Sequence, residues 1–121
     1  MRLLLVEDNK RLSDSLRLTL EDDGYAVDVA YDGEKGWDLA SVYPYDLIIL
    51  DLMIPGIQGM DLCRMLRNDP KTKNLPIIML TAKGEEPDIV TGLNVGANDY
   101  ITKPIQPNRI LDVTRSLLHI P

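Results

Sequence analysis

The stretch at positions 47–56 reads Leu-Ile-Ile-Leu-Asp-Leu-Met-Ile-Pro-Gly. Four consecutive aliphatic residues, followed soon by Pro55-Gly56, predict a short strand covered on both faces rather than a helix. Asp51 then lies at the carboxyl end of that strand, where ligands and chemistry gather in an open α/β sheet. The stretch therefore indicates both a fold class and a candidate site, although a strand-end acid that caps a turn is the alternative interpretation.

The rest of the chain alternates short apolar runs with amphipathic stretches. Strands are expected over residues 2–6, 25–30, 47–51, 76–80 and 100–102. Helices are expected near 12–20 and 33–43 and over 60–68, 87–95 and 107–118, and in the first of them Leu12, Leu16, Leu18 and Leu20 suit one face. Five strands that alternate with five flanking helices predict an α/β fold with a flavodoxin-like, doubly wound parallel sheet of order 2-1-3-4-5.

The composition is that of one globular domain over residues 1–121, with 45% hydrophobic and 26% charged residues. No apolar run is long enough to span a bilayer, so no membrane contact is expected. The apolar start at 1–6 is too short for a signal peptide, and we therefore expect a cytoplasmic location. A net charge of −6 opposes direct binding of nucleic acid by this chain.

Cysteine and histidine, which often carry chemistry, are scarce. Cys63, the only cysteine, stands among apolar residues at helical spacing and is predicted to be a buried, inert thiol. His119, the only histidine, is expected to be exposed or to act as a cation at a helix end. Catalytic Cys-His or Ser-His pairs and multi-histidine zinc sites therefore lack parts.

Acids end the two strands that flank the expected switch point of the sheet. Glu7 and Asp8 follow the first strand, and Asp51 ends the third. Converging carboxylates repel each other, so either one of them holds a proton or a cation shares the site. An oxygen-only cluster with open water positions suits Mg²⁺, which usually works beside phosphate. The cluster therefore predicts Mg²⁺ as the cofactor and a phosphate compound as the substrate.

Two further strand ends would complete a phosphoryl site. Thr81 offers a hydroxyl after the fourth strand, and Lys103 offers an ammonium that can neutralise a phosphoryl oxygen. Asp51 would then be the nucleophile of an in-line attack that forms an aspartyl phosphate. Each residue alone also has a structural interpretation, as a loop acid, a strand-end cap or a surface charge. Their joint placement on four strand ends favours the functional interpretation.

Several motifs along the chain carry a resemblance to a known family. They are Val6-Glu7-Asp8-Asn9, Leu50-Asp51-Leu52-Met53-Ile54-Pro55-Gly56, Leu80-Thr81-Ala82, Gly96-Ala97-Asn98-Asp99-Tyr100 and Lys103-Pro104. Together they resemble the receiver domain of two-component response regulators, of the chemotaxis-receiver type, over essentially the whole chain. The resemblance implies a signalling domain that accepts a phosphoryl group from a sensor histidine kinase or a small phosphodonor. It implies no enzyme activity beyond the domain's own phosphorylation and dephosphorylation.

The resemblance also implies the acceptor and the metal ligands. By it, Asp51 is the phosphoacceptor, and Glu7 and Asp8 hold Mg²⁺ together with Asp51. The backbone carbonyl of Met53 would complete the protein ligands. The sequence therefore predicts a metal centre built on the loops that follow the first and third strands.

Further residues resemble the family's phosphoryl contacts. Lys103 would bind a phosphoryl oxygen, and its bond to Pro104 resembles the family's cis peptide, which an X-Pro bond adopts most cheaply. The backbone amide of Ala82 would donate to the phosphoryl group, and its small side chain would leave access to the site. Met53 and Lys83 occupy positions that tune the phosphoryl lifetime in the family.

Thr81 and Tyr100 resemble the family's switch pair, in which the hydroxyl moves to the phosphoryl group and the ring turns inward. The output face implied by the resemblance comprises the helix at 88–95, the strand at Tyr100 and the helix at 107–118. Through this face the domain would reach an effector domain or a downstream protein. A phosphorylation-dependent homodimer is the other partner that stays open.

Two alternative functions also stay open. An unphosphorylated, receiver-like interaction module is disfavoured, because every acid, the hydroxyl and the lysine are present. A phosphate-binding or phosphatase α/β domain is less favoured still, since the loop after the first strand has acids in place of a Gly/Ser/Thr cradle. Moreover, Met53 stands where a phosphatase of the dehalogenase type would have a second acid.

Overall fold

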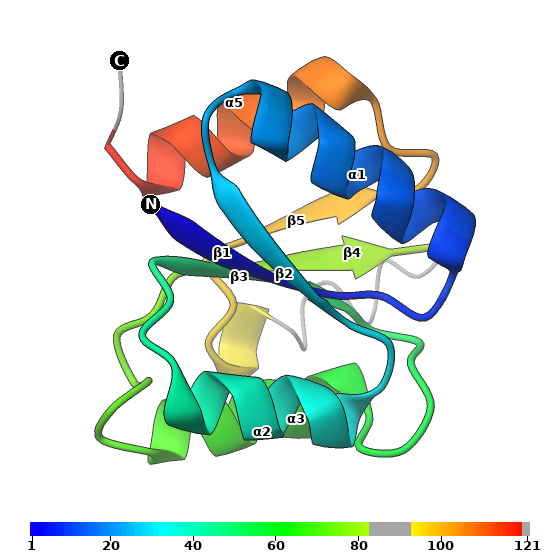
Figure 1. The fold of residues 1–121 in the computed structure, drawn as a ribbon. Coiled ribbons are helices and arrows are strands. Elements are labelled where there is room, and N and C mark those ends of the chain that lie inside the picture. Colours follow the sequence, from blue (N-terminus) through cyan, green and yellow to red (C-terminus); the bar gives the residue numbers. More distant parts are fainter. Residues whose placement is uncertain (83–92, 120–121) are drawn as a thin grey trace.

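A computed structural model describes residues 1–82 and 93–119 (Figure 1). In chain order the elements are β1 (Arg2–Val6), α1 (Lys10–Asp22), β2 (Ala26–Ala30), α2 (Gly33–Val42), β3 (Leu47–Asp51), α3 (Gly59–Asn68), β4 (Ile77–Thr81), β5 (Asp99–Thr102) and α5 (Pro107–Leu117). All neighbouring strands pair in parallel, in the order β2-β1-β3-β4-β5. The predicted flavodoxin-like sheet is therefore confirmed. Within the described ranges, none of the helices has the length and apolar character needed to cross a lipid bilayer.

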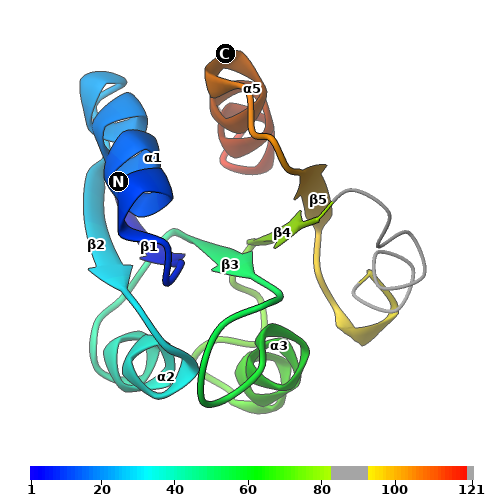
Figure 2. The same ribbon diagram turned by 90° about the vertical axis from the view of Figure 1, so that its right-hand side faces the viewer.

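Helices cover both faces of the sheet, α1 and α5 on one side and α2 and α3 on the other (Figures 1 and 2). Side chains alternate between the two faces along each strand, so one strand supplies both cores. The core under α1 and α5 includes Leu3, Leu5, Leu16, Leu20, Ile49, Ile110 and Val113. The core under α2 and α3 includes Leu4, Val6, Ile48, Leu50, Leu62, Leu66 and Met79. Every residue of β3 and β4 is buried, as central strands of a doubly wound sheet require.

The element boundaries differ from the sequence-based prediction by small amounts. The strand expected over 76–80 runs Ile77–Thr81, because the Lys103 N–H donates to the Thr81 carbonyl at 2.7 Å and extends the pairing of β4 with β5. The helix expected over 87–95 reaches into residues outside the described ranges, and its last part, 93–95, is helical.

The prediction for Leu18 was wrong. Leu16 and Leu20 are buried on the inner face of α1, whereas the Leu18 side chain is 55% exposed. A residue two positions from each of them is rotated by about 200° around the helix axis and faces away from the sheet. Cys63 is buried as predicted, and burial raises the pKa of its thiol. His119 is exposed, also as predicted.

The buried position of β3 leads to a stability prediction. Ile49→Val removes one methyl group from a side chain with 0% exposure and keeps its β-branched shape. We expect the free energy of unfolding to fall by about 1 kcal/mol, because the space left behind is only partly refilled. Val42→Ala, at a position that is 71% exposed, is the control and should lower it by less than about 0.5 kcal/mol. Urea unfolding measures both, and equal losses would contradict the central placement of Ile49.

Candidate functional site

The fold brings three acids to the carboxyl edge of the sheet. β1 and β3 are neighbours, with Val6 opposite Leu50, and the chain continues from them into the two acidic positions. Glu7, Asp8 and Asp51 each place one carboxylate oxygen within 4.8 Å of the other two. This edge is also the topological switch point, because the chain leaves β1 and β3 toward opposite faces of the sheet.

Backbone amides orient the two buried carboxylates. Glu7 is fully buried and Asp51 is 2% exposed, whereas Asp8 is exposed. Asp51 Oδ1 accepts a hydrogen bond from the Met53 N–H at 2.9 Å, and Glu7 Oε2 accepts one from the Asn9 N–H at 3.1 Å. Short local bonds of this kind help to hold each carboxylate in one orientation.

Asn9 was not among the predicted site residues, although it has two roles here. Its N–H bonds the Glu7 carboxylate, and its side chain accepts from the Leu12 N–H at 3.1 Å and caps α1. An asparagine directly before an apolar-periodic stretch is a recognisable N-cap signal. The sequence could therefore have placed Asn9 at the start of the helix, but not against Glu7.

Lys103 extends from the end of β5 into the acid cluster. Its Nζ lies 2.7 Å from Asp51 Oδ2 and 3.1 Å from Glu7 Oε1, and its bond to Pro104 is cis. Burial alone would lower the pKa of Lys103, but the hydrogen bond with Asp51 and the charges of both acids outweigh it and raise that pKa. The ammonium is therefore charged at neutral pH and partly neutralises the two buried carboxylates.

Glu7 holds its proton unusually tightly. Burial, followed by the neighbouring Asp51 carboxylate, raises the pKa of Glu7 to about 7. Without a metal ion, the protonated and ionised forms of Glu7 are thus close in energy near neutral pH. One carboxylate oxygen, Glu7 Oε1, is buried and accepts no hydrogen bond among residues 1–82 and 93–119, and the Lys103 ammonium lies 3.1 Å from it. A buried carboxylate oxygen without a hydrogen bond, in a cluster whose three donor atoms are all oxygens, fits a hard divalent cation such as Mg²⁺.

Thr81 and Tyr100 lie on the same face of the sheet. Met79 is opposite Tyr100 and Thr81 is opposite Thr102, so Tyr100 and Thr81 are diagonal neighbours across β4 and β5. Thr81 is 1% exposed, and its hydroxyl has no hydrogen-bond partner in the described part of the chain. The Tyr100 ring is half-buried and packs against the core under α2 and α3. The Thr81 hydroxyl, which has no hydrogen bond in the described residues, thus lies on the same face as the Tyr100 ring, its expected switch partner.

Two of the predicted site residues, Ala82 and Met53, are exposed at the edge of the site, unlike the buried Glu7 and Asp51. Ala82 is exposed directly after β4, and the Met53 side chain is 66% exposed. Lys83, predicted to tune the phosphoryl lifetime, lies outside the described residues. Of the predicted set, the structure therefore brings together Glu7, Asp8, Asp51 and Lys103, with the Met53 amide at their side.

Close backbone contacts fix the loop that follows Asp51, and sequence reasoning missed them. A Cβ atom at Gly59 would lie 2.4 Å from the Asp51 carbonyl oxygen, and one at Gly33 would lie 2.0 Å from the Ile57 carbonyl oxygen. The Gly33 N–H also donates to the Pro55 carbonyl at 3.1 Å. The start of α2 thus supports the loop that carries Met53. No local pattern shows these approaches, since the first depends on how the loop folds back on β3 and the second joins segments distant in sequence.

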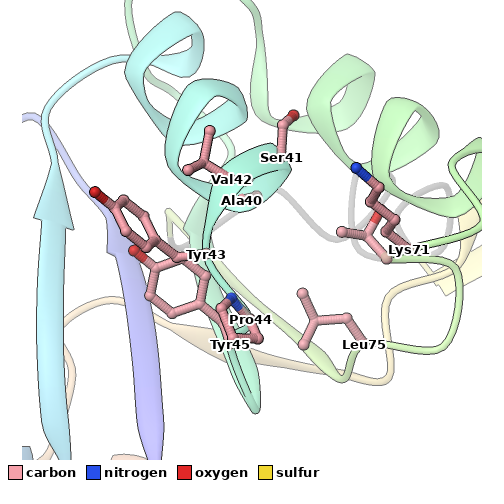
Figure 3. A pocket seen from close by; sticks show the side chains of 9 residues that line it. Ala40, Ser41, Val42, Tyr43, Pro44, Tyr45, Lys71 and Leu75 are labelled. Carbon is pink, nitrogen blue, oxygen red and sulfur yellow. The ribbon is translucent and has the colours of Figure 1, made fainter.

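A separate pocket of about 410 Å³ lies near the opposite edge of the sheet, between the end of α2 and the loop after α3 (Figure 3). It is lined by Ala40, Ser41, Val42, Tyr43, Pro44, Tyr45, Lys71, Thr72 and Leu75. None of the predicted site residues lines it. The convergence of charged groups, rather than this hollow, therefore identifies the candidate site.

Comparison with known proteins agrees with the sheet order and the acid cluster. The sequence model of the response regulator receiver domain matches residues 3–115. The chain belongs to this family of receiver domains from two-component signalling, which confirms the resemblance seen in its motifs.

Individual relatives show how far the similarity extends. The response regulator ArlR of Staphylococcus haemolyticus is 46% identical over 116 residues, which are 96% of this chain and 52% of that protein. The chain thus spans about half the length of the curated relatives it matches. A candidate response regulator from Chloroflexus aurantiacus has a TM-score of 0.94 and 37% identity over 98% of this chain and 97% of that one. A third relative is the receiver domain of the Pseudomonas aeruginosa sensor histidine kinase PA1611, whose structure has a magnesium ion coordinated in the active-site cleft. It has a TM-score of 0.90 and 30% identity, and the match covers 98% of this chain and 97% of that one.

Proposed function

We propose that this domain is a phosphorylation-controlled switch in which Asp51 accepts a phosphoryl group from a sensor histidine kinase or a small phosphodonor. One observation carries the proposal: the buried Asp51 carboxylate lies between the Met53 N–H and the Lys103 ammonium, beside the oxygens of Glu7 and Asp8. An oriented nucleophile next to a cation and further metal-type ligands is the arrangement that phosphoryl transfer requires.

In the proposed reaction, a carboxylate oxygen of Asp51 attacks the phosphorus of the donor. The new oxygen–phosphorus bond makes Asp51 an acyl phosphate, and the bond from phosphorus to the donor's leaving atom breaks in line with it. Lys103, already 2.7 Å from Asp51, would remain paired with the added charge at a phosphoryl oxygen. The amide of Ala82 and the hydroxyl of Thr81 would donate to other phosphoryl oxygens.

The acids would hold the metal. Glu7, Asp8, Asp51 and the carbonyl of Met53 are the proposed ligands of Mg²⁺. When bound, the ion supplies positive charge that offsets both the carboxylates and the incoming phosphoryl oxygens. Glu7 must release its proton for this, and its pKa of about 7 allows the release near neutral pH.

The added phosphoryl charge, about −1.5 to −2, is proposed to act through Thr81 and Tyr100. The Thr81 hydroxyl is buried and unpaired among the described residues, so a phosphoryl oxygen offers it a partner. Its movement would free space on the face that Tyr100 shares, and the ring would turn inward. The proposed output face comprises β5, α5 and the helix over 88–95, of which residues 88–92 lie outside the described ranges. Its partner is an effector domain, a downstream protein or a second copy of the domain.

Acetyl phosphate provides the direct test. Incubated with it and Mg²⁺, the full chain is expected to gain one phosphoryl group by intact mass spectrometry and to lose it slowly by its own hydrolysis. A parallel sample with EDTA should gain far less, because the acid cluster then keeps its charge unneutralised. A histidine kinase presented as phosphodonor forms a third sample.

The outcomes separate the candidate functions. Failure of the chain to gain a phosphoryl group from either donor would favour an unphosphorylated interaction module. Sustained turnover of unrelated phosphate esters, without a covalent intermediate on Asp51, would favour a phosphatase.

A further inference from the structure

Arg67, in the last turn of α3, holds together segments that are far apart in the sequence. Its guanidinium donates to the carbonyls of Gly96 (2.9 Å), Leu75 (2.7 Å), Lys73 (3.2 Å) and Thr72 (3.4 Å), and to Asn98 Oδ1 (2.9 Å). All five acceptors are neutral oxygens on the loop after α3 or on the segment before β5. A planar group with several fixed donors can bridge acceptors in this way, whereas a lysine cannot.

Asn98 connects this guanidinium to the sheet. Its side-chain oxygen also accepts from the Ile77 N–H at 2.8 Å, and its own N–H donates to the Ile77 carbonyl at 2.9 Å. Asn98 therefore pairs in both directions with the first residue of β4, while Arg67 holds its side chain from the other side. The Asn98 side chain takes part in these bonds through its oxygen alone, so an aspartate could make them as well.

Gly96 shows how closely Arg67 packs there. Its φ is +123°, and a Cβ at this position would lie 2.8 Å from Arg67 Cγ and 2.9 Å from Arg67 Nε. Any side chain would both strain the backbone and displace the guanidinium. Figure 2 shows this segment on the same side of the sheet as α3, directly before β5.

We propose that Arg67 and Asn98 form a clamp that sets the register of β5 on β4 and so positions Tyr100 on the face of Thr81. β5 begins at Asp99, directly after Asn98, and Tyr100 is opposite Met79. Because the clamp fixes the start of β5, the Tyr100 ring has a defined position when the Thr81 hydroxyl moves. The inference rests on the proposed function, because the position of Tyr100 matters for signalling only if Asp51 is phosphorylated.

The test compares Arg67→Gln with Arg64→Gln. Arg64 is on the same helix but is exposed, and it pairs only with Asp61 among the described residues. In the unphosphorylated chain, Arg67→Gln should speed amide hydrogen exchange at Ile77 by about tenfold, since the Asn98 acceptor is released. Arg64→Gln should leave that rate unchanged, and Asn98→Asp should preserve the slow exchange of wild type.

The second measurement uses acetyl phosphate, Mg²⁺ and the NMR signals of the Tyr100 ring. All variants should gain one phosphoryl group by mass, and wild type and Arg64→Gln should show a shift of the ring signals. Arg67→Gln should lose that shift. If Arg67→Gln does not fold, Arg67→Lys replaces it, because lysine keeps the charge without the fork of donors.

Wild-type exchange at Ile77 together with a full ring shift in Arg67→Gln would overturn the clamp and leave the proposed function intact. Absence of phosphorylation in wild type would instead overturn the proposed function, and the exchange rate at Ile77 would then decide on the clamp alone.

Discussion

Asp51→Asn is expected to abolish phosphorylation of this domain by acetyl phosphate and by a histidine kinase. The asparagine oxygen can still accept from the Met53 N–H, so the shape of the site should persist. However, an amide lacks the negative charge and the nucleophilic oxygen that attack on phosphorus requires. Intact mass should therefore show one added phosphoryl group in wild type and none in the variant.

Asp38→Asn is the matched control, because Asp38 is an exposed acid on α2, away from the carboxyl edge of the sheet. It should be phosphorylated like wild type. Circular dichroism and urea unfolding should show that both variants fold. A phosphoryl group on Asp51→Asn would move the acceptor role to another side chain, and peptide mapping would show whether Asp8, the exposed acid of the cluster, carries it.

Glu7→Gln is expected to change how stability depends on pH and on Mg²⁺. Folding raises the pKa of Glu7 from its ordinary value of 4.5 to about 7, so the folded state binds this proton more tightly than the unfolded state does. Without metal, the free energy of unfolding should therefore fall as pH rises from about 4.5 to about 7, by on the order of 3 kcal/mol. Glutamine removes this titration, and the variant should be more stable than wild type at pH 8 but not at pH 5.

Added Mg²⁺ should make wild type more stable than Glu7→Gln at pH 8. The ion binds deprotonated carboxylates, so its stabilisation of wild type should be larger at pH 8 than at pH 5. Glu7→Gln should lose most of that stabilisation, whereas Asp38→Asn should keep it. Urea unfolding at the two pH values, with and without Mg²⁺, measures all of these differences. A wild-type stability that does not change with pH in this window would contradict the raised pKa of Glu7.

The strand-end residues show how far sequence reasoning reached. The aliphatic run that stops at Asp51 predicts the end of a buried strand there, and in the structure β3 ends at Asp51. Glu7 and Asp8 were expected beside it because parallel strands share one carboxyl edge, and their oxygens do converge. Each of these predictions needs only a local pattern and the topology of a doubly wound sheet.

Other features depend on contacts that no local pattern contains. The recurrence of four leucines along α1 predicts that Leu18 shares one face with the others, but its angle around the helix places its side chain in solvent. The contact of Gly33 with Ile57 in the Asp51 loop joins residues 24 positions apart, and the hydrogen bond of Arg67 to Asn98 joins residues 31 positions apart. In the sequence, Arg67 looks like any arginine on the surface of a helix. Its hydrogen-bond partners could therefore not be predicted.

By itself, the sequence determined the fold class, the edge at which the polar residues gather and the chemical types that meet there. Hydrophobic periodicity and strand-end positions are short-range properties of the sequence. In a parallel sheet the carboxyl ends of the strands lie at one edge, so the residues at those ends meet there. Only the tertiary structure decided that Lys103 pairs with both buried acids, that the pKa of Glu7 rises to about 7 and that Arg67 bonds Asn98 at the base of β5. Those properties depend on burial and on distances between side chains, which are defined only once the elements have packed.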